Sequence, residues 1–225
     1  MLRKRSHKGR DMTKAAQKFT PRRGRPTAAQ VEAIDNALIS TGRRHFLENG
    51  FDAVAMEAIA FELGVSKTTL YGRFPSKEAL FHAIVEDAVA RWSADAAKDD
   101  AELTDNIEQR LRHHVRVIAR SHINPEVQAF QRIIISTAGR FPALAKSMHD
   151  VGTVYIISLI SRDISDAAKR DRLLAHDPEG IATRIVASMT GWYMQQSLVR
   201  SVGLEEFFKY GDRTVDIIMA ARSIW

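Results

Sequence analysis

Helical periodicity constrains this chain more than any other feature. From residue 27 onward, apolar residues such as Val31, Ile34 and Leu38 recur at intervals of three and four, and no segment alternates as a strand would. Helix ends are marked by Asn49-Gly50, since glycine accepts the left-handed conformation that terminates helices, and by prolines placed where a first helical turn accepts them. An all-α fold is therefore predicted. After a first helix ending at Asn49-Gly50, the expected helices span residues 56–63, 67–74, 77–92, 104–121, 125–138, 142–170 (with a break near Gly152), 178–200 and 204–224.

Composition excludes several classes of protein. The chain has no cysteine, which rules out disulfide scaffolds, thiolate zinc sites, iron–sulfur clusters and cysteine nucleophiles. Its hydrophobic residues make up 45% and its charged residues 27%, enough apolar material for a sizeable core. No 18-residue apolar run and no apolar segment after the N-terminal charges are present, so we expect a soluble cytoplasmic protein.

Enzymatic signatures are missing from the sequence. It contains neither a GxGxxG nor a GxxxxGK[ST] phosphate-binding loop. His113, His114 and His122 lack an HExxH pattern or cysteine partners, and Ser161 lacks a nucleophile elbow. We therefore expect no catalysis, no cofactor and no bound metal.

The first 26 residues form a basic arm. Residues 1–25 hold ten lysines and arginines against the single acid Asp11, a charge of +9, whereas the whole chain carries +6. Such a segment has too few aliphatic residues to fold alone and is expected to stay disordered until it meets a polyanion such as DNA. Within it, Arg23-Gly24-Arg25-Pro26 resembles the core of an AT-hook, in which Arg23 and Arg25 enter the minor groove. The alternative is a solvated tail, with Met12 as the true initiator.

Residues 56–75 carry the strongest local signal. Two short predicted helices are joined by a turn at Gly64, the arrangement of a helix-turn-helix unit. Ala60 is small where the helices would cross, and Ser66 is placed to cap the second of them. Polar and cationic groups on the outer face suit phosphates and base edges in a major groove, although a buried helical hairpin with polar outer positions remains the alternative. The outward residues are Lys67, Thr68, Thr69, Tyr71 and Arg73.

Three segments in this region, Phe46–Phe51, Met56–Ala60 and Gly64–Leu80, resemble the DNA-binding domain of the TetR family. The resemblance implies an all-helical, dimeric protein that represses transcription until a small molecule binds its C-terminal domain. It also implies a domain at residues 27–76 that binds DNA, and an effector-binding and dimerisation domain at 77–225 that begins with a connecting helix at 77–95. Between the connecting helix and the next one, the polar run Asp95–Asp105 is expected to act as a hinge.

Carried over onto this sequence, the resemblance assigns DNA contacts. Lys67, Thr68 and Thr69 would face bases and nearby phosphates, and Tyr71 would press on the sugar–phosphate backbone. Lys77 would contact phosphate at the next helix N-terminus, where free N–H groups reinforce its charge. The DNA-binding set predicted from the sequence is Arg23, Arg25, Ser66, Lys67, Thr68, Thr69, Tyr71, Arg73 and Lys77.

The sequence also departs from the family pattern. Val54 and Ala55 stand where hydroxyl residues are usual, so the second helix loses its common cap, and Asp52 is a substitute candidate. Arg73 replaces a histidine or tyrosine and offers an additional phosphate or guanine contact. His45 replaces an apolar residue and is expected on partly exposed helix surface.

The C-terminal segments Arg132–Ile135 and Ala138–Ala145 are similar to the AefR-like, or AcrR-type, branch of the family. The helices at 178–200 and 204–224 are apolar over a wide arc, which predicts burial on both sides. Two such helices from each subunit would form a four-helix dimer interface, with small residues such as Ala187 and Gly191 allowing close approach; the alternative is the core of a monomer. The expected interface residues are Ile185, Ser188, Met189, Val215, Ile218 and Met219.

An effector pocket is expected among the helices of the C-terminal domain. Apolar pockets with a few polar groups are the usual sites for small molecules, which indicates a lipophilic or aromatic effector. Each candidate is alternatively an ordinary core residue. The candidates are Phe130, Ile134, Met148, Tyr155, Trp192 and Gln196.

These patterns favour a dimeric, sequence-specific regulator of transcription that binds double-stranded DNA at a palindromic operator. We interpret it as a repressor released by its effector. The first alternative is an architectural DNA-binding protein led by the basic arm. The second is a protein-interaction module that has kept the fold and lost operator binding.

Overall fold

The structure, a computed structural model, describes residues 27–100, 104–172 and 174–225, and within these ranges every regular element is a helix. The first helix, α1 (Ala28–Ala53), begins with a capping box in which the Thr27 side chain accepts a hydrogen bond from the Gln30 amide and the Gln30 side chain accepts one from the Thr27 amide. Its helical geometry is interrupted at Gly50, where φ is +76°, as the predicted stop at Asn49-Gly50 requires.

Helices α2 (Met56–Leu63) and α3 (Lys67–Arg73) complete a three-helix head with α1. Helix α4 (Lys77–Asp100) leads away from this head. The expected hinge at Asp95–Asp105 is partly wrong, because helical backbone continues to Asp100. Alanine-rich sequence in this stretch has high helix propensity, which outweighs its polar character.

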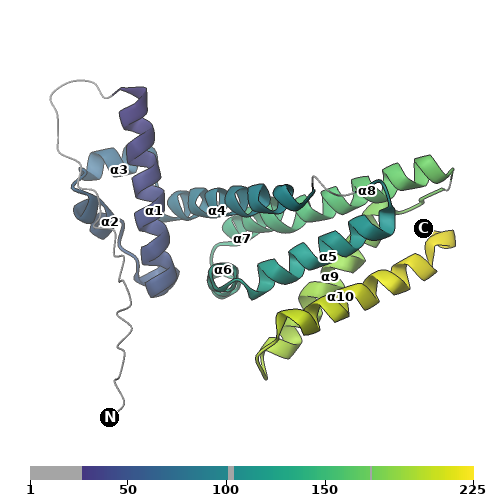
Figure 1. Cartoon of the computed structure of the whole chain (residues 1–225). Coiled ribbons are helices and arrows are strands. Elements are labelled where there is room, and N and C mark those ends of the chain that lie inside the picture. Colours follow the sequence, from purple (N-terminus) through teal and green to yellow (C-terminus); the bar gives the residue numbers. More distant parts are fainter. Residues whose placement is uncertain (1–26, 101–103, 173) are drawn as a thin grey trace, which may run out of the picture.

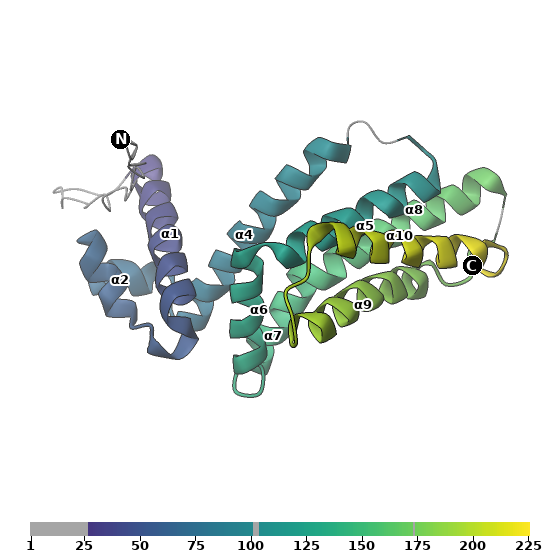
Figure 2. The same cartoon turned by 60° about the horizontal axis from the view of Figure 1, so that its bottom comes forward.

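The C-terminal domain consists of α5 (Ile107–Ile123), α6 (Pro125–Thr137), α7 (Pro142–His149), α8 (Tyr155–Asp171), α9 (Pro178–Ser197) and α10 (Leu204–Ala220). A π-helical turn, η1 (Asp150–Val154), joins α7 to α8, and a 3₁₀ turn, η2 (Arg222–Ile224), follows α10. The break predicted near Gly152 is thus confirmed as a change in helical pitch. Figures 1 and 2 show α5, α8, α9 and α10 running side by side as a bundle, with α4 between this bundle and the head.

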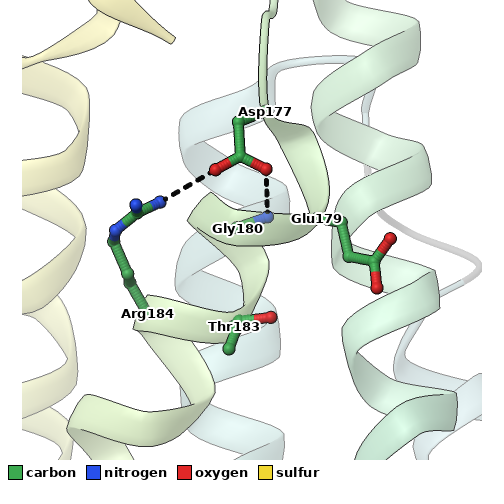
Figure 3. A pocket seen from close by; sticks show the side chains of 5 residues that line it. All are labelled: Asp177, Glu179, Gly180, Thr183 and Arg184. Carbon is green, nitrogen blue, oxygen red and sulfur yellow. Dashed lines mark hydrogen bonds and ion pairs between the residues drawn. The ribbon is translucent and has the colours of Figure 1, made fainter.

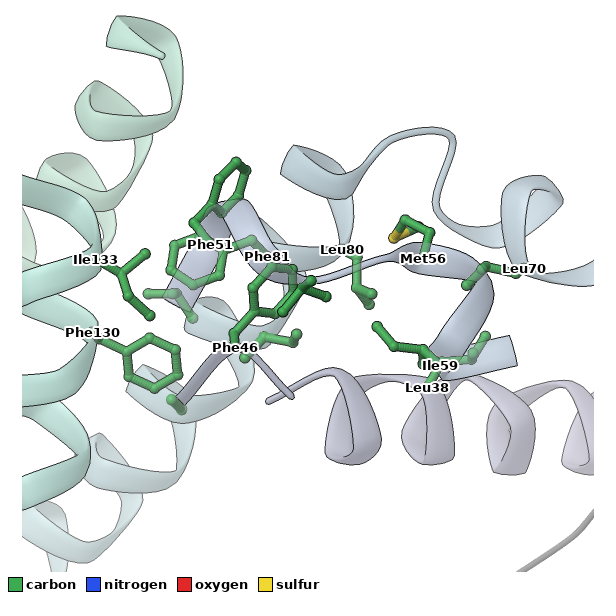
Figure 4. Packing of buried hydrophobic residues seen from close by; sticks show 14 of the residues in the cluster. Leu38, Phe46, Phe51, Met56, Ile59, Leu70, Leu80, Phe81, Phe130 and Ile133 are labelled. Carbon is green, nitrogen blue, oxygen red and sulfur yellow. The ribbon is translucent and has the colours of Figure 1, made fainter. Parts of the chain in front are cut away.

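Two hydrophobic cores stabilise the chain. The first lies in the head and includes Leu38, Phe46 and Phe81, all fully buried. It extends beyond the expected domain boundary at residue 76, because α4, α6 and α7 also contribute side chains to it. Figure 4 shows Phe130 and Ile133 of α6 reaching toward the phenylalanines of the head.

The second core fills the bundle of α5, α8, α9 and α10. Gly211 allows α10 to approach α5 closely, because a Cβ there would lie 3.0 Å from the Cβ of Val115 and 3.1 Å from Cε of Met189. None of the helices in the described ranges has the length and apolarity that a membrane crossing requires.

Candidate nucleic-acid interface

The turn between α2 and α3 has the geometry that the sequence predicts. Gly64 adopts φ +68° and ends α2, and the Val65 amide bonds to the Ala60 carbonyl at 3.0 Å. The Ser66 hydroxyl then accepts a hydrogen bond of 3.0 Å from the Thr69 amide and caps α3. Leu70 is fully buried beneath this turn, so the opposite face of α3 points outward.

That outward face carries the predicted DNA-contacting side chains. The side chain of Lys67 is 71% exposed, Thr68 is exposed, and Tyr71 is 40% exposed as a residue. Thr69 is half-buried, and its hydroxyl lies 2.8 Å from that of Ser66. The structure therefore presents a cation, a hydroxyl and a phenol together on one short helix with a fixed start.

A carboxylate that the sequence analysis did not select lies beside this face. Glu57, in the first turn of α2, accepts a hydrogen bond of 3.1 Å from the Tyr71 hydroxyl and lies 3.7 Å from the Lys67 ammonium. Its own backbone amide, then the Tyr71 hydroxyl, lower the pKa of Glu57, and the same hydroxyl contact raises the pKa of Tyr71. In the sequence, this contact is indicated only by an acidic residue, Glu57, on the helix that precedes the cationic helix α3.

Two predicted phosphate contacts are engaged within the chain. The Lys77 ammonium donates to the carbonyls of Asp52 at 3.2 Å and Val54 at 3.1 Å, and it lies 4.9 Å from the centre of the Phe51 ring. Lys77 thus fastens the end of α1 to the start of α4. Arg73 pairs with Asp35 of α1 at 3.5 Å. Each side chain keeps donors beyond these contacts, since a lysine ammonium has three N–H groups and an arginine guanidinium five.

The interpretation of Asp52 as a substitute cap is wrong. Helix α2 has Ala55 at its N-cap and no side-chain capping bond. The carboxylate of Asp52 instead pairs with Arg140 at 2.6 Å, which lowers the pKa of Asp52. Beside this pair, the rings of Phe51 and Phe141 lie 5.2 Å apart, so the loop between α6 and α7 contacts the head at this point. His45 is partly exposed as expected and bonds to Glu62 at 2.9 Å.

Some predicted positions lie outside the described residues. Arg23 and Arg25 belong to the segment 1–26, and the side chain of Met148 is likewise not described. The remaining effector candidates are divided between the two cores and the surface. Phe130 and Ile134 pack with the head core, Trp192 packs with the bundle core, and Tyr155 is 45% exposed. Gln196 accepts hydrogen bonds from Arg200.

Three of the predicted interface residues lie inside the core of a single chain. Ile185, Met189 and Val215 are fully buried within one chain, so they cannot contact a partner. Ile218 and Met219 are partly buried against the same core, and Ser188 hydrogen-bonds to the Tyr210 hydroxyl at 2.8 Å. Other positions on these two helices are exposed, including Ala187, Met194 and Ile217, and so is Leu198 directly after α9.

A hollow at the start of α9 is polar and its groups satisfy one another. Figure 3 shows the Asp177 carboxylate between the Gly180 amide, at 2.8 Å, and Arg184, at 3.3 Å. A Cβ at Gly180 would overlap the Asp177 carboxylate, which explains the glycine. This hollow is a helix cap. Among the described residues, no group of three His, Cys, Asp or Glu side chains is arranged to hold a metal ion.

Comparisons with known proteins agree with this geometry. Residues 38–84 match the profile of the tetR family of bacterial regulatory proteins, and residues 109–221 match that of the AefR-like transcriptional repressor C-terminal domain. The HTH-type transcriptional regulator RutR of Escherichia coli is 41% identical over 83 residues, which cover 37% of either chain. The HTH-type transcriptional activator FasR of Mycolicibacterium smegmatis is 32% identical over 133 residues, covering 58% of this chain and 60% of FasR. The chain thus spans less than two thirds of these relatives.

Solved structures match over more of the chain. The flavonoid-responsive regulator FrrA has a TM-score of 0.70 and 29% identity, covering 84% of this chain and 97% of FrrA. A TetR-family regulator from Mesorhizobium loti has a TM-score of 0.68 and 20% identity, covering 87% and 98%.

The all-helical fold, the turn between α2 and α3 and the exposed face of α3 together define a helix-turn-helix protein that binds DNA and regulates transcription. With its C-terminal half matched as well, the chain belongs to the TetR family. Proteins of this family and the relatives named above are regulators rather than enzymes.

Proposed function

We propose that the protein is a homodimeric repressor that binds a palindromic operator through α3 and leaves it when a lipophilic or aromatic effector binds the C-terminal domain. The observation that carries this proposal is the outward face of α3. Its Ser66 cap fixes the helix start, and Lys67, Thr68 and Tyr71 project from it. Such a protein acts in the bacterial cytoplasm, on the nucleoid.

Exposed apolar residues support the dimer. Met194 is 46% exposed, Leu198 84% and Ile217 60%, and Ala187 lies two turns before Met194 on α9. A second copy of the chain would cover this surface, and a two-fold axis there would give two recognition helices. They must lie about 34–36 Å apart to enter successive major grooves.

Sedimentation analysis tests the dimer with a matched pair of variants. Leu198→Glu places a charge within the proposed interface, whereas Leu174→Glu makes the same change at a residue that is 79% exposed in the connection before α9. We expect Leu198→Glu to sediment as a monomer and Leu174→Glu as a dimer. A dimeric Leu198→Glu protein would place the interface elsewhere.

Three comparisons bear on how the protein regulates transcription and on what its effector is. The match to an AefR-like repressor domain supports repression. FasR is named an activator, so the change in transcription of a target gene must be measured with and without the protein. FrrA is named flavonoid-responsive, which supports an aromatic effector for this chain.

The operator is tested by selection from random-sequence DNA, followed by salt-titrated binding of the selected duplex and a scrambled one. We expect a preference of about a thousandfold for the selected duplex. Lys67→Ala or Tyr71→Ala should remove most of this preference without unfolding the protein, because both side chains are exposed.

The same measurement separates the alternatives. An architectural protein led by the arm would lose most of its affinity when residues 1–25 are deleted, and it would bind both duplexes equally. A protein-interaction module would bind neither duplex above a charge-matched control. Either result would contradict the operator-binding proposal.

A further inference from the structure

The last turn of α5 buries an imidazole with one unused nitrogen. His122 is 9% exposed, and its Nδ1 donates a hydrogen bond of 2.9 Å to the carbonyl of Ile118. Its Nε2 is buried and has no hydrogen-bond partner among the described residues. Buried polar atoms are nearly always paired, so an unpaired one in a core needs an explanation.

The hydrogen-bonding role of this nitrogen is fixed. Burial lowers the pKa of His122, which keeps the ring neutral near pH 7. Because Nδ1 carries the hydrogen that bonds to Ile118, the neutral ring has a lone pair at Nε2. Any group that binds there must donate a hydrogen.

A donor lies next to this acceptor. The hydroxyl oxygen of Tyr193 accepts a hydrogen bond of 2.8 Å from Gln128 of α6, which leaves the phenolic hydrogen for another acceptor. The rings of Tyr193 and His122 lie 5.4 Å apart and nearly at right angles. The pair therefore offers one acceptor and one donor, and a ligand hydroxyl, which both donates and accepts, complements the two.

Aromatic rings surround these polar groups. Phe207 of α10 stacks on Tyr193, with centroids 5.2 Å apart and planes inclined by 14°. Phe207 also lies 5.2 Å from Trp192, and Trp192 stacks on Tyr210 at 4.5 Å. The two polar groups thus lie in aromatic surroundings, which suit an aromatic ligand better than a charged one.

We propose that His122 and Tyr193 form the polar end of the effector site, and that this site takes a planar aromatic ligand through a phenolic hydroxyl. The hydroxyl donates to Nε2 of His122 and accepts from Tyr193, while the aromatic rings of α9 and α10 contact the ligand skeleton. This inference rests on the proposed effector response and names the chemical class of the effector.

Helix α6 connects this site to the DNA-binding head. Gln128 holds the Tyr193 hydroxyl and also donates to the His122 carbonyl at 3.1 Å. On the same helix, Phe130 packs against Phe81 of α4 at 5.8 Å and against Trp92 at 6.1 Å. A ligand hydroxyl bound to Tyr193 and His122 thus contacts two residues that Gln128 ties to α6, the helix that contacts the head.

Calorimetric titration of the full chain with a monohydroxylated flavone and with the methyl ether of the same hydroxyl tests the proposal. Methylation removes the donated hydrogen and leaves the ring skeleton intact. We expect the hydroxyflavone to bind the wild-type protein at least about tenfold more tightly, the size of one hydrogen bond that is otherwise left unmade in a buried site. His122→Phe and Tyr193→Phe should each reduce this preference to about twofold or less.

His149→Phe is the matched control, because it replaces an imidazole whose side chain is 59% exposed at the end of α7 and should leave the preference unchanged. Melting curves establish that each variant is folded, and if His122→Phe fails to fold, Tyr193→Phe decides. Equal binding of the two flavones to the wild-type protein would overturn the proposal and would leave Nε2 with a water partner only. The proposal would also be overturned if folded His122→Phe kept the preference for the hydroxyflavone over its methyl ether, or if neither flavone bound the protein. Operator binding without ligand is measured separately, so these outcomes do not touch the proposed DNA-binding function.

Discussion

The two cores of this protein differ in what they bury. The buried side chains of the head core are aliphatic and aromatic, and the rings of Phe46, Phe51 and Phe81 lie in mutual contact with centroids 5.1–5.6 Å apart. The polar residues buried on its helices α1 and α6 are the threonines Thr41 and Thr137. The bundle core also contains hydrogen-bonded polar side chains, including His122 and Tyr193. An apolar, close-packed core has few alternative arrangements, whereas polar groups in a core can exchange partners with a ligand. The difference supports the proposed division of the protein into a head that binds DNA and a bundle that binds an effector.

Helix α6 belongs to both regions. Its Phe130 and Ile133 complete the head core, while its Gln128 bonds to Tyr193 in the bundle. An ionic cluster supports the same junction, since Glu126 lies 3.6 Å from Arg43 of α1 and 3.3 Å from Arg91 of α4. Movement of α6 therefore changes contacts on both sides at once, which is the physical requirement for coupling effector and DNA.

The largest expected effect is a loss of stability from a substitution in the head core. Phe81→Ala removes a fully buried ring that contacts Phe46, Phe51 and Phe130. We expect it to lower the free energy of unfolding by about 3–5 kcal/mol, measured by urea denaturation. Phe61→Ala is the control, because Phe61 is 87% exposed and its loss should change stability by no more than about 0.5 kcal/mol. Similar values for the two variants would contradict the arrangement of the head core.

A smaller effect is expected at the surface of the head. Glu57→Gln removes the negative charge beside Lys67 while keeping an acceptor for the Tyr71 hydroxyl. We expect about tenfold tighter binding to DNA, with a salt dependence steeper by about one unit, because Lys67 becomes available to one more phosphate. The measurement is fluorescence anisotropy at several salt concentrations.

Glu86→Gln on α4 makes the same charge change at a residue paired with His82, outside the α2–α3 turn, and should leave DNA affinity nearly unchanged. Weaker binding by Glu57→Gln would instead make the carboxylate itself a contact with DNA.

Two glycines compare close packing within the bundle. Gly211→Ala gains about 1 kcal/mol of helix propensity but forces a methyl against Val115 at 3.0 Å, and overpacking of this kind costs about 1–3 kcal/mol. We expect a net loss of about 1 kcal/mol in the free energy of unfolding. At Gly191 a Cβ meets nothing within 4 Å, so Gly191→Ala should gain up to about 1 kcal/mol at protein concentrations low enough to keep the chain monomeric. Equal effects in thermal unfolding would show that α10 does not lie as close to α5 as described.

The sequence predicted local features, such as turns and helix caps, better than it predicted contacts between separate helices or subunits. The Gly64 turn and the Ser66 cap follow from backbone chemistry that acts within a few residues. Periodicity identified Ile185 and Met189 as buried but does not distinguish a core from a dimer interface, since both require apolar residues. The contact of Glu57 with Tyr71, and of Gln128 with Tyr193, depends on how separate helices cross. No pattern within either helix contains that information.

The smallest expected effect concerns acid sensitivity of the bundle. Burial lowers the pKa of His122 below its ordinary value of 6.5, so in the unfolded chain this residue takes up a proton at a higher pH than in the folded one. As pH falls below about 6.5, the unfolded state binds more protons and the free energy of unfolding decreases; above it, this contribution is constant. His122→Phe should flatten this decrease between pH 6.5 and the lower folded pKa, as measured by urea denaturation at a series of pH values. His149→Phe, which changes a histidine whose side chain is 59% exposed, should keep the wild-type slope. If His122→Phe keeps the wild-type slope, the imidazole takes up protons in the folded protein as readily as in the unfolded one. His122 would then not be a buried polar group, and the comparison of the two cores would lose this example.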